Sequence, residues 1–208
     1  MEGEGGGLQM NIVIIKYNAG NIESVNNALM RLGVKAEITA DHEKIKEADK
    51  VIFPGVGEAS TTMAYLREHK LDNLIKSLKQ PVLGICLGQQ LMCSYSEEGD
   101  TKCLSIFPEK VKRFQPAPGQ EYVTKVPHMG WNSIHDLKGQ LLTSDLENGY
   151  VYFVHSYYVE VGADTAAVCD YINPFSAALQ KDNFYATQFH PEKSQKVGAK
   201  ILENFIKL

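Results

Sequence analysis

The sequence contains no long hydrophobic run and no excess of positive charge. A membrane-spanning helix needs about 20 consecutive apolar residues, and no stretch of this chain approaches that length. The N-terminus lacks the basic and then apolar pattern of a secretory signal, so the sequence predicts a cytoplasmic protein. With a formal net charge of −4, the chain has no basic field to attract a nucleic-acid backbone or an anionic membrane. We therefore expect small-molecule or protein partners.

Cysteine is also scarce, with four residues in a chain of 208. Their spacing matches neither the short pairs of a zinc site nor the density of a secreted disulfide scaffold. The sequence therefore predicts no metal site and four reduced thiols, any of which could be reactive. These cysteines are Cys86, Cys93, Cys103 and Cys169.

A chain of this length with 44% hydrophobic residues can enclose one sizeable core. The first nine residues hold four glycines and two glutamates, too little apolar surface to offset the entropy of ordering them. We therefore predict a disordered N-terminal extension over residues 1–9 and a single domain over 10–208.

Strands and helices are predicted to alternate along the first half of the chain. Residues 11–17 form a β-branched run without alternation, which is typical of a strand buried on both faces of a parallel sheet. A helix should follow, because Ile22, Val25 and Leu29 recur at helical spacing and Gly33 can end it. Further strands are predicted at 34–39, 50–53 and 81–85, and helices at 42–48, 58–79 and 89–93.

The second half contains more glycine and proline, with tyrosine-rich and β-branched segments between them. Strands are predicted at 122–126, 150–154, 166–171 and 184–189, and a last helix at 193–207. Alternating helices and buried strands predict an α/β fold with an open three-layer, mixed and mainly parallel sheet flanked by helices. Ligands of such folds bind at the carboxyl ends of the strands.

Residues 84–88 read Gly-Ile-Cys-Leu-Gly between a predicted strand and a predicted helix. This matches the nucleophile elbow G-x-S-x-G with sulfur in place of oxygen, in which glycines permit a sharp turn. A helix N-terminus after the turn stabilises a thiolate. An isolated cysteine is more often a small buried hydrophobe, but this context favours Cys86 as a nucleophile. Cys93, Cys103 and Cys169 lack it and are predicted to be structural.

A nucleophilic cysteine needs a base, and the base needs a group that orients it. The predicted strand 184–189 ends abruptly at His190-Pro191-Glu192, which places two titratable side chains two residues apart on a turn. His190 is therefore the strongest candidate base and Glu192 its partner. His42 and His69 lie in polar helical stretches and are predicted to be surface residues, and the pattern predicts no role for His128.

Together, the motifs at 84–90 (Gly-Ile-Cys-Leu-Gly-Gln-Gln) and 188–192 (Gln-Phe-His-Pro-Glu) resemble those of class I glutamine amidotransferases. The resemblance implies a flavodoxin-like fold, glutamine as substrate, no cofactor, and a triad of Cys86, His190 and Glu192. Gln89 stands where the family often has methionine, and residues 103–106 replace a more glycine-rich stretch. Neither departure touches the triad.

An oxyanion formed at the substrate needs backbone donors already in place. Leu87, after the nucleophile, can supply one, and the glycine-containing segment 54–57 (Pro-Gly-Val-Gly) can supply another near Val56 and Gly57. The resemblance implies that the peptide at Val56 must first turn its N–H inward. The alternative for this segment is a plain strand-ending turn. For the tyrosines that follow Ser156, the alternative to substrate binding is packing within a strand. By resemblance, the substrate-binding residues are Gly55, Gln90, His155, Ser156 and Tyr157.

Four segments further resemble one branch of the family, whose members supply ammonia to a (βα)8-barrel cyclase of histidine biosynthesis. They are 17–21 (Tyr-Asn-Ala-Gly-Asn), 54–57, 127–132 (Pro-His-Met-Gly-Trp-Asn) and 155–158 (His-Ser-Tyr-Tyr). The resemblance implies a heterodimer, and low glutaminase activity for the chain alone. The implied interface residues are Asn18, Asn21, Pro127, Met129, Trp131, Asn132, Tyr152 and Lys193, although a core role for Trp131 remains an alternative.

Three other functions remain open from the sequence. The chain could feed a different synthase, for example one making anthranilate, guanylate or pyridoxal phosphate. It could be a catalytically silent binding module that regulates a synthase. It could also be a hydrolase of γ-glutamyl compounds, which uses the same cysteine and histidine chemistry.

Overall fold

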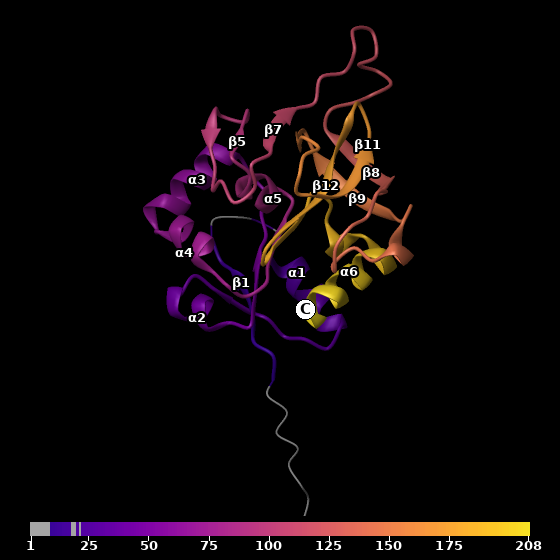
Figure 1. The fold of residues 1–208 in the computed structure, drawn as a ribbon. Coiled ribbons are helices and arrows are strands. Elements are labelled where there is room, and N and C mark those ends of the chain that lie inside the picture. Colours follow the sequence, from indigo (N-terminus) through magenta and orange to yellow (C-terminus); the bar gives the residue numbers. More distant parts are fainter. Residues whose placement is uncertain (1–8, 18–19, 21) are drawn as a thin grey trace, which may run out of the picture.

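The computed structural model describes residues 9–17, 20 and 22–208. Its centre is a seven-stranded sheet in the order β11-β12-β13-β4-β3-β1-β2 (Figure 1). The five strands from β13 to β2 are parallel, and β12 and β11 add antiparallel strands at one edge. The sheet consists of β1 (Ile12–Ile15), β2 (Glu37–Thr39), β3 (Lys50–Phe53), β4 (Val82–Ile85), β11 (Thr165–Asp170), β12 (Pro174–Lys181) and β13 (Phe184–Thr187).

Helices cover both faces of this sheet, which makes three layers. One face carries α1 (Ile22–Arg31) and α6 (Gln195–Lys207), and the other carries α2 (His42–Glu47), α3 (Ala59–Glu68), α4 (Leu71–Ser77) and α5 (Leu87–Met92). Strand β1 shows why both faces of the sheet are covered, because its apolar side chains point to both. Ile12 and Ile14 pack into the core cluster beneath α1 and α6, whereas Val13 and Ile15 pack into the opposite cluster. The predicted fold class is confirmed.

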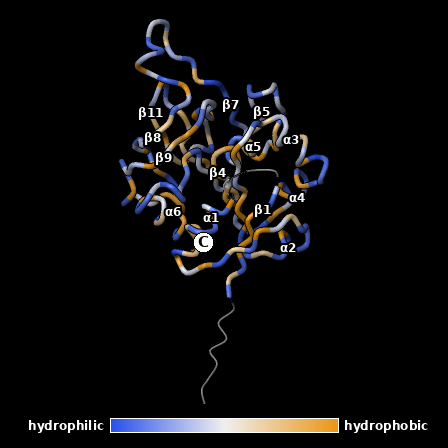
Figure 2. The backbone as a smooth tube through the Cα atoms, turned by 180° about the vertical axis from the view of Figure 1, so that it is seen from behind, coloured by the Kyte–Doolittle hydropathy of each residue, from blue (hydrophilic) through white to orange (hydrophobic). Residues whose placement is uncertain are grey.

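Two smaller sheets lie beyond the carboxyl ends of the central strands, and the sequence analysis did not predict them as separate units. One contains β10 (Tyr157–Val159), β7 (Lys110–Arg113), β5 (Tyr95–Ser96) and β6 (Thr101–Lys102). The other is a hairpin of β8 (His128–Ser133) and β9 (Tyr150–His155), and a 3-10 turn, Ser144–Leu146, precedes β9. Figure 2 shows hydrophobic residues concentrated around β1 and β4 and hydrophilic residues on the outer loops.

The predicted strand at 122–126 is wrong. These residues form turns in a loop that projects from the top of the molecule in Figure 1, where Tyr122 is 90% and Val123 is 76% exposed. The local β-propensity has no effect because no neighbouring strand pairs with this segment, and strand preference depends on such packing. Pro116 and Pro118 separate the loop from β7.

Two predicted helix boundaries also differ. The helix expected over 58–79 is two helices, α3 and α4, separated at Lys70, whose φ of 56° is left-handed. The helix expected over 193–207 begins at Gln195, after the 3-10 turn Pro191–Lys193. The predicted extension over 1–9 lies outside the described residues except for Gln9. Among the helices of the described segments, none has the length and apolar character needed to cross a bilayer.

Candidate active site

The turn between β4 and α5 places Cys86 at the carboxyl end of the central strand. Cys86 has φ 56° and ψ −111°, a backbone conformation that residues other than glycine rarely adopt. A Cβ on Gly88 would lie 2.1 Å from the carbonyl oxygen of Phe53, and one on Gly84 would lie 2.7 Å from Met92 Sδ. Both glycines are therefore required by close packing around the turn, as an elbow demands.

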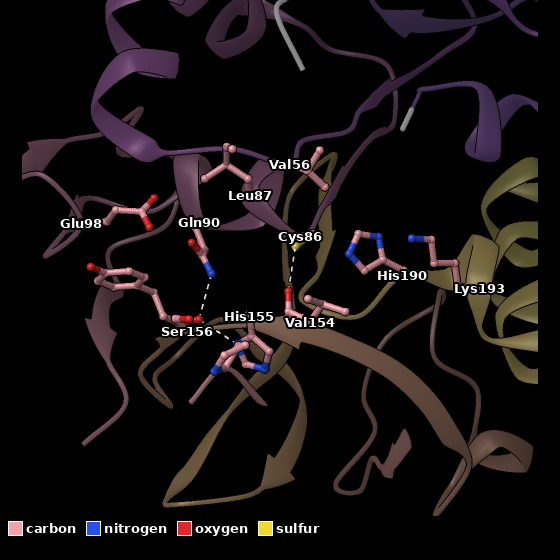
Figure 3. A pocket seen from close by; sticks show the side chains of 13 residues that line it. Val56, Cys86, Leu87, Gln90, Glu98, Val154, His155, Ser156, His190 and Lys193 are labelled. Carbon is pink, nitrogen blue, oxygen red and sulfur yellow. Dashed lines mark hydrogen bonds between the residues drawn. The ribbon is translucent and has the colours of Figure 1, made fainter. Parts of the chain in front are cut away.

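A cavity of about 400 Å³ opens in front of this turn, within the usual size for a small-molecule site. It lies where β3, β4 and β13 end, and the two smaller sheets form its other wall (Figure 3). The lining residues come from segments far apart in the sequence. They are Val56, Gly57, Cys86, Leu87, Gln90, Glu98, Pro127, Val154, His155, Ser156, Tyr157, His190 and Lys193.

His190 and Glu192 form a buried pair beside Cys86. His190 Nδ1 lies 2.7 Å from Glu192 Oε1, and the two side chains are 4% and 1% exposed. Burial lowers the pKa of His190, but the interactions with the neighbouring Cys86 and Glu192 side chains outweigh it and raise that pKa to about 10. Because Nδ1 is occupied by Glu192, Nε2 is the ring nitrogen that remains for Cys86. The backbone N–H of His190 donates to the Tyr152 carbonyl at 3.0 Å, which fixes this turn against β9.

The other three cysteines do not line this cavity among the described residues. All are buried free thiols. Burial raises the pKa of Cys103 and of Cys169 to about 12, and raises that of Cys93 well above its usual value. Groups held as neutral thiols in this way are poor nucleophiles.

The predicted oxyanion donors are near the thiol, but one of them is occupied. The Leu87 N–H donates to the Gly55 carbonyl at 3.1 Å. In a trans peptide the carbonyl and the N–H point in opposite directions, so the Val56 N–H points away from Leu87. Tyr17 Oη donates to the preceding carbonyl, that of Pro54, and so holds this segment from the β1 side.

The predicted substrate-binding residues come from more than one wall, with Gln90 on α5 and His155, Ser156 and Tyr157 on the facing wall. Gln90 is buried, and its Nε2 donates to the Tyr157 carbonyl and to Gln188 Oε1, both at 2.9 Å. Ser156 and Tyr157 line the cavity, and so does His155, whose Nδ1 lies 2.7 Å from the Tyr157 carbonyl. Gly55 is absent from the lining of this cavity, but lines a narrow adjoining one that His190 and Glu192 also reach.

Sequence reasoning missed Glu98, which supplies the one carboxylate among the described lining residues. Figure 3 shows it beside Gln90, on the far side of the cavity from Lys193. Its Oε1 accepts the Ala59 N–H at 2.6 Å, and burial raises its pKa. No local pattern could have found it, because it lies in a short turn between β5 and β6 whose position depends on tertiary contacts.

A family model for class I glutamine amidotransferases matches residues 13–208. The chain belongs to this family. The predicted resemblance is confirmed.

Curated amidotransferase relatives match over almost the whole chain. The imidazole glycerol phosphate synthase subunit HisH of Bacteroides fragilis is 62% identical over 199 residues, which cover 96% of this chain and 100% of the relative. The protein of the same name from Bacteroides thetaiotaomicron is 61% identical with the same coverage. The one from Escherichia coli K12 is 44% identical over 201 residues, covering 96% of this chain and 100% of the relative.

Solved structures of amidotransferases share the fold at low identity. One glutamine amidotransferase matches with a TM-score of 0.70 and 16% identity, covering 94% of this chain and 97% of the other. A glutamine amidotransferase from Thermotoga maritima matches with a TM-score of 0.63 and 12% identity, covering 96% and 83%. These matches support the fold.

The residues predicted to contact a partner of this amidotransferase occupy different settings. Met129 is 63% and Trp131 46% exposed on β8, and Trp131 packs edge-on against Tyr152 with ring centroids 5.9 Å apart. Pro127 and Lys193 line the cavity. The Asn132 side chain instead bonds within the protein, to the Asp170 carbonyl and the Ser133 N–H. Asn18 and Asn21 lie outside the described residues.

Proposed function

We propose that this amidotransferase is the glutaminase subunit of an imidazole glycerol phosphate synthase. It hydrolyses glutamine at Cys86 and delivers the ammonia to a (βα)8-barrel cyclase subunit in histidine biosynthesis. One observation carries the proposed chemistry. Cys86 and His190 both line a cavity large enough for an amino acid, and His190 is hydrogen-bonded to Glu192.

In the first half-reaction the Cys86 thiolate attacks the side-chain amide carbon of glutamine and forms a tetrahedral oxyanion. His190 passes a proton to the departing nitrogen, and the carbon–nitrogen bond breaks to release ammonia and leave a thioester. Glu192 holds Nδ1 of His190, so that Nε2 serves the reacting atoms.

In the second half-reaction water attacks the thioester. His190 takes a proton from this water and returns it to the sulfur, so that glutamate leaves and Cys86 is regenerated. The same two backbone donors stabilise both oxyanions, and each contributes on the order of 3 kcal/mol in such sites.

The carboxylate of Glu98 at one end of the cavity orients the substrate. Glutamine carries an ammonium and a carboxylate on its α-carbon, and Glu98 supplies the carboxylate that pairs with the ammonium. The backbone of Ser156 and Tyr157, which also line the cavity, contacts the α-substituents. The side-chain amide then extends toward Cys86.

Free ammonia is mostly protonated in neutral water and is then not a nucleophile, so the product should pass directly to a partner. The cyclase uses it to close the imidazole ring of imidazole glycerol phosphate and releases an aminoimidazole carboxamide ribonucleotide. Exposed Met129 and Trp131 provide apolar anchors beside the cavity, as interfaces commonly do. Binding of the acceptor favours the state in which the Val56 N–H points inward.

The test is glutamate release from glutamine by the purified chain, with and without a histidine-pathway cyclase and its ribonucleotide substrate. We expect strong stimulation by both together, and its loss in Cys86→Ala but not in Cys93→Ala, which removes a buried thiol outside the cavity. Activity indifferent to the cyclase would disprove the pathway assignment. No turnover under any condition would favour a silent binding module, and broad γ-glutamyl turnover without a partner would favour a hydrolase.

A further inference from the structure

Two buried histidines, His155 in the substrate wall and His128 beside it, have rings that the mechanism above does not use. His128 on β8 and His155 on β9 are directly opposite in the hairpin, and each residue is 4–5% exposed. His128 Nδ1 lies 2.9 Å from His155 Nε2. The His128 ring also stacks between Tyr171 and Phe153, with centroids 4.0 Å and 4.8 Å away. Burial lowers the pKa of His128 to about 4 and that of His155 to about 3, so both rings are neutral near pH 7.

The hydrogen bonds at the cavity end fix the direction of this pair. The Tyr157 carbonyl can only accept, so His155 must carry its proton on Nδ1, which lies 2.7 Å away. Neutral His155 then accepts at Nε2, and His128 must donate from Nδ1.

The other end leads to the same assignment. Asn132 Oδ1 accepts the Ser133 N–H at 2.8 Å, so its amide nitrogen is the donor, bonded to the Asp170 carbonyl at 2.9 Å. That nitrogen lies 3.4 Å from His128 Nε2, which therefore accepts. A single directed chain thus runs from Asn132 through both rings to the Tyr157 carbonyl.

The chain joins two functional surfaces. Its inner end is a carbonyl in the cavity wall that also accepts from Gln90. Its outer end lies on β8, where successive side chains face opposite sides. Met129 and Trp131 are exposed on one side of this strand, while His128 and Asn132 on the other side bond inward.

We propose that His128 and His155 are positioning residues that hold the Ser156–Tyr157 backbone in the geometry that binds glutamine. His128 acts through His155 and never touches substrate. This proposal rests on the glutaminase function proposed above, and it adds a role for the directed hydrogen bond from His128.

Two substitutions separate this role from simple packing. His128→Asn retains an N–H donor, because asparagine Nδ2 is bonded to Cγ as histidine Nδ1 is. It loses the stacked ring. His128→Phe retains a ring of similar size for stacking but leaves His155 Nε2 without its donor. A positioning role predicts that Phe raises KM for glutamine about tenfold while kcat changes less than about twofold, and that Asn stays near wild type. A packing role predicts the larger defect for Asn.

KM and kcat are measured for the complex with the cyclase and its ribonucleotide substrate. Saturation of Cys86 labelling by a thiol-reactive glutamine analogue gives the binding constant for the chain alone, and nitrogen NMR of the rings reports the tautomers. An unchanged KM in His128→Phe, an equal KM change in both variants, or an Nε2–H tautomer at His155 would overturn the proposal. A wild-type chain that neither turns over glutamine nor is labelled would instead disprove the glutaminase function, and the proposal with it.

Discussion

The backbone N–H of Leu87 donates to the carbonyl of Gly55 at 3.1 Å. The group expected to stabilise the oxyanion is therefore bonded to the peptide that should provide the second donor. Rotation of the Gly55–Val56 peptide would free Leu87 and bring the Val56 N–H to the same side. In the observed state the proposed nucleophile and base are in place, but neither proposed oxyanion donor is available to substrate. A partner that favours the rotated peptide would therefore control hydrolysis without touching the proposed triad.

The Val56 N–H can be tested by removing it. Val56→Pro has no N–H to present, so we expect cyclase-stimulated glutaminase activity to fall about 10²- to 10³-fold, the usual effect of losing one oxyanion donor. Val56→Ala keeps the N–H and is the matched control, because the side chain is 36% exposed. Steady-state glutamate release is the measurement. Equal activity of the proline and alanine variants would exclude this N–H as a donor.

The parts of the site that were predicted from sequence are local in the chain. The elbow at Cys86 and the turn at His190 and Glu192 each consist of a strand, a sharp turn and flanking residues within about five positions, and strand ends meet at one edge of a parallel sheet. Glu98 and the His128–His155 pair could not be predicted. Their positions depend on β5 and β6, which have two residues each, and on the pairing of β8 with β9, which are far apart in the sequence.

Most strands of the central sheet were also predicted from local sequence, but β12 (Pro174–Lys181) was missed. Strands buried on both faces give continuous apolar runs, as in β1 and β3. The failed strand at 122–126 has the same β-branched and aromatic composition but no partner strand, and composition alone does not report that difference. The break at Lys70 was missed because lysine is rarely left-handed.

The elbow glycine Gly88 should not tolerate a side chain. A Cβ there would approach the Phe53 carbonyl to 2.1 Å, and backbone cannot move aside as a flexible side chain can. We expect Gly88→Ala to lower the free energy of unfolding by about 3 kcal/mol, at the upper end for overpacking. Gly119→Ala, in open space at φ 82°, should cost about 1 kcal/mol. Urea unfolding measures both, and equal losses would contradict the packing argument.

The role of Glu98 is tested by removing its charge alone. Glu98→Gln keeps an oxygen for the Ala59 N–H but no longer pairs as an anion with an ammonium group. We expect KM for glutamine to rise about tenfold, since hydrogen bonds to charged groups contribute about 1.5–3 kcal/mol, with kcat nearly unchanged. A glutamine analogue without the α-amino group should be processed equally by both proteins. A KM increase for that analogue too would point to a general distortion of the site.

The raised pKa of His190 predicts a loss of stability in alkaline solution. Its folded pKa of about 10 lies above the usual 6.5, so the unfolded chain loses this proton first as pH rises. The stabilisation is complete below about pH 6.5 and disappears as pH passes about 10. Between pH 7 and pH 9 the stability advantage of wild type over His190→Asn should shrink in urea unfolding. A constant difference would show that the imidazolium is not stabilised.

The buried histidine pair predicts the opposite behaviour in acid. Burial lowers the pKa of His128 to about 4 and that of His155 to about 3, whereas both titrate near 6.5 in the unfolded chain. As pH falls below about 6.5, the unfolded chain binds protons at these two rings and the folded protein does not. The free energy of unfolding therefore decreases until the pH approaches 4 to 3. Each ring should account for about 2 kcal/mol of the loss between pH 7 and pH 5, and His128→Phe should remove its share.

His135 provides a control of opposite sign for this acid loss. Although burial lowers its pKa, hydrogen bonds to Asp170 and Asp136 outweigh that effect and raise it. The folded protein therefore binds a proton at His135 before the unfolded chain does, and His135→Asn should make the acid loss larger. Unfolding free energies at pH 5, 6 and 7 for wild type and both variants decide the matter. If His128→Phe loses as much stability in acid as wild type, then the buried pair must accept protons in the folded state, and the single directed chain of hydrogen bonds could not persist at pH 5.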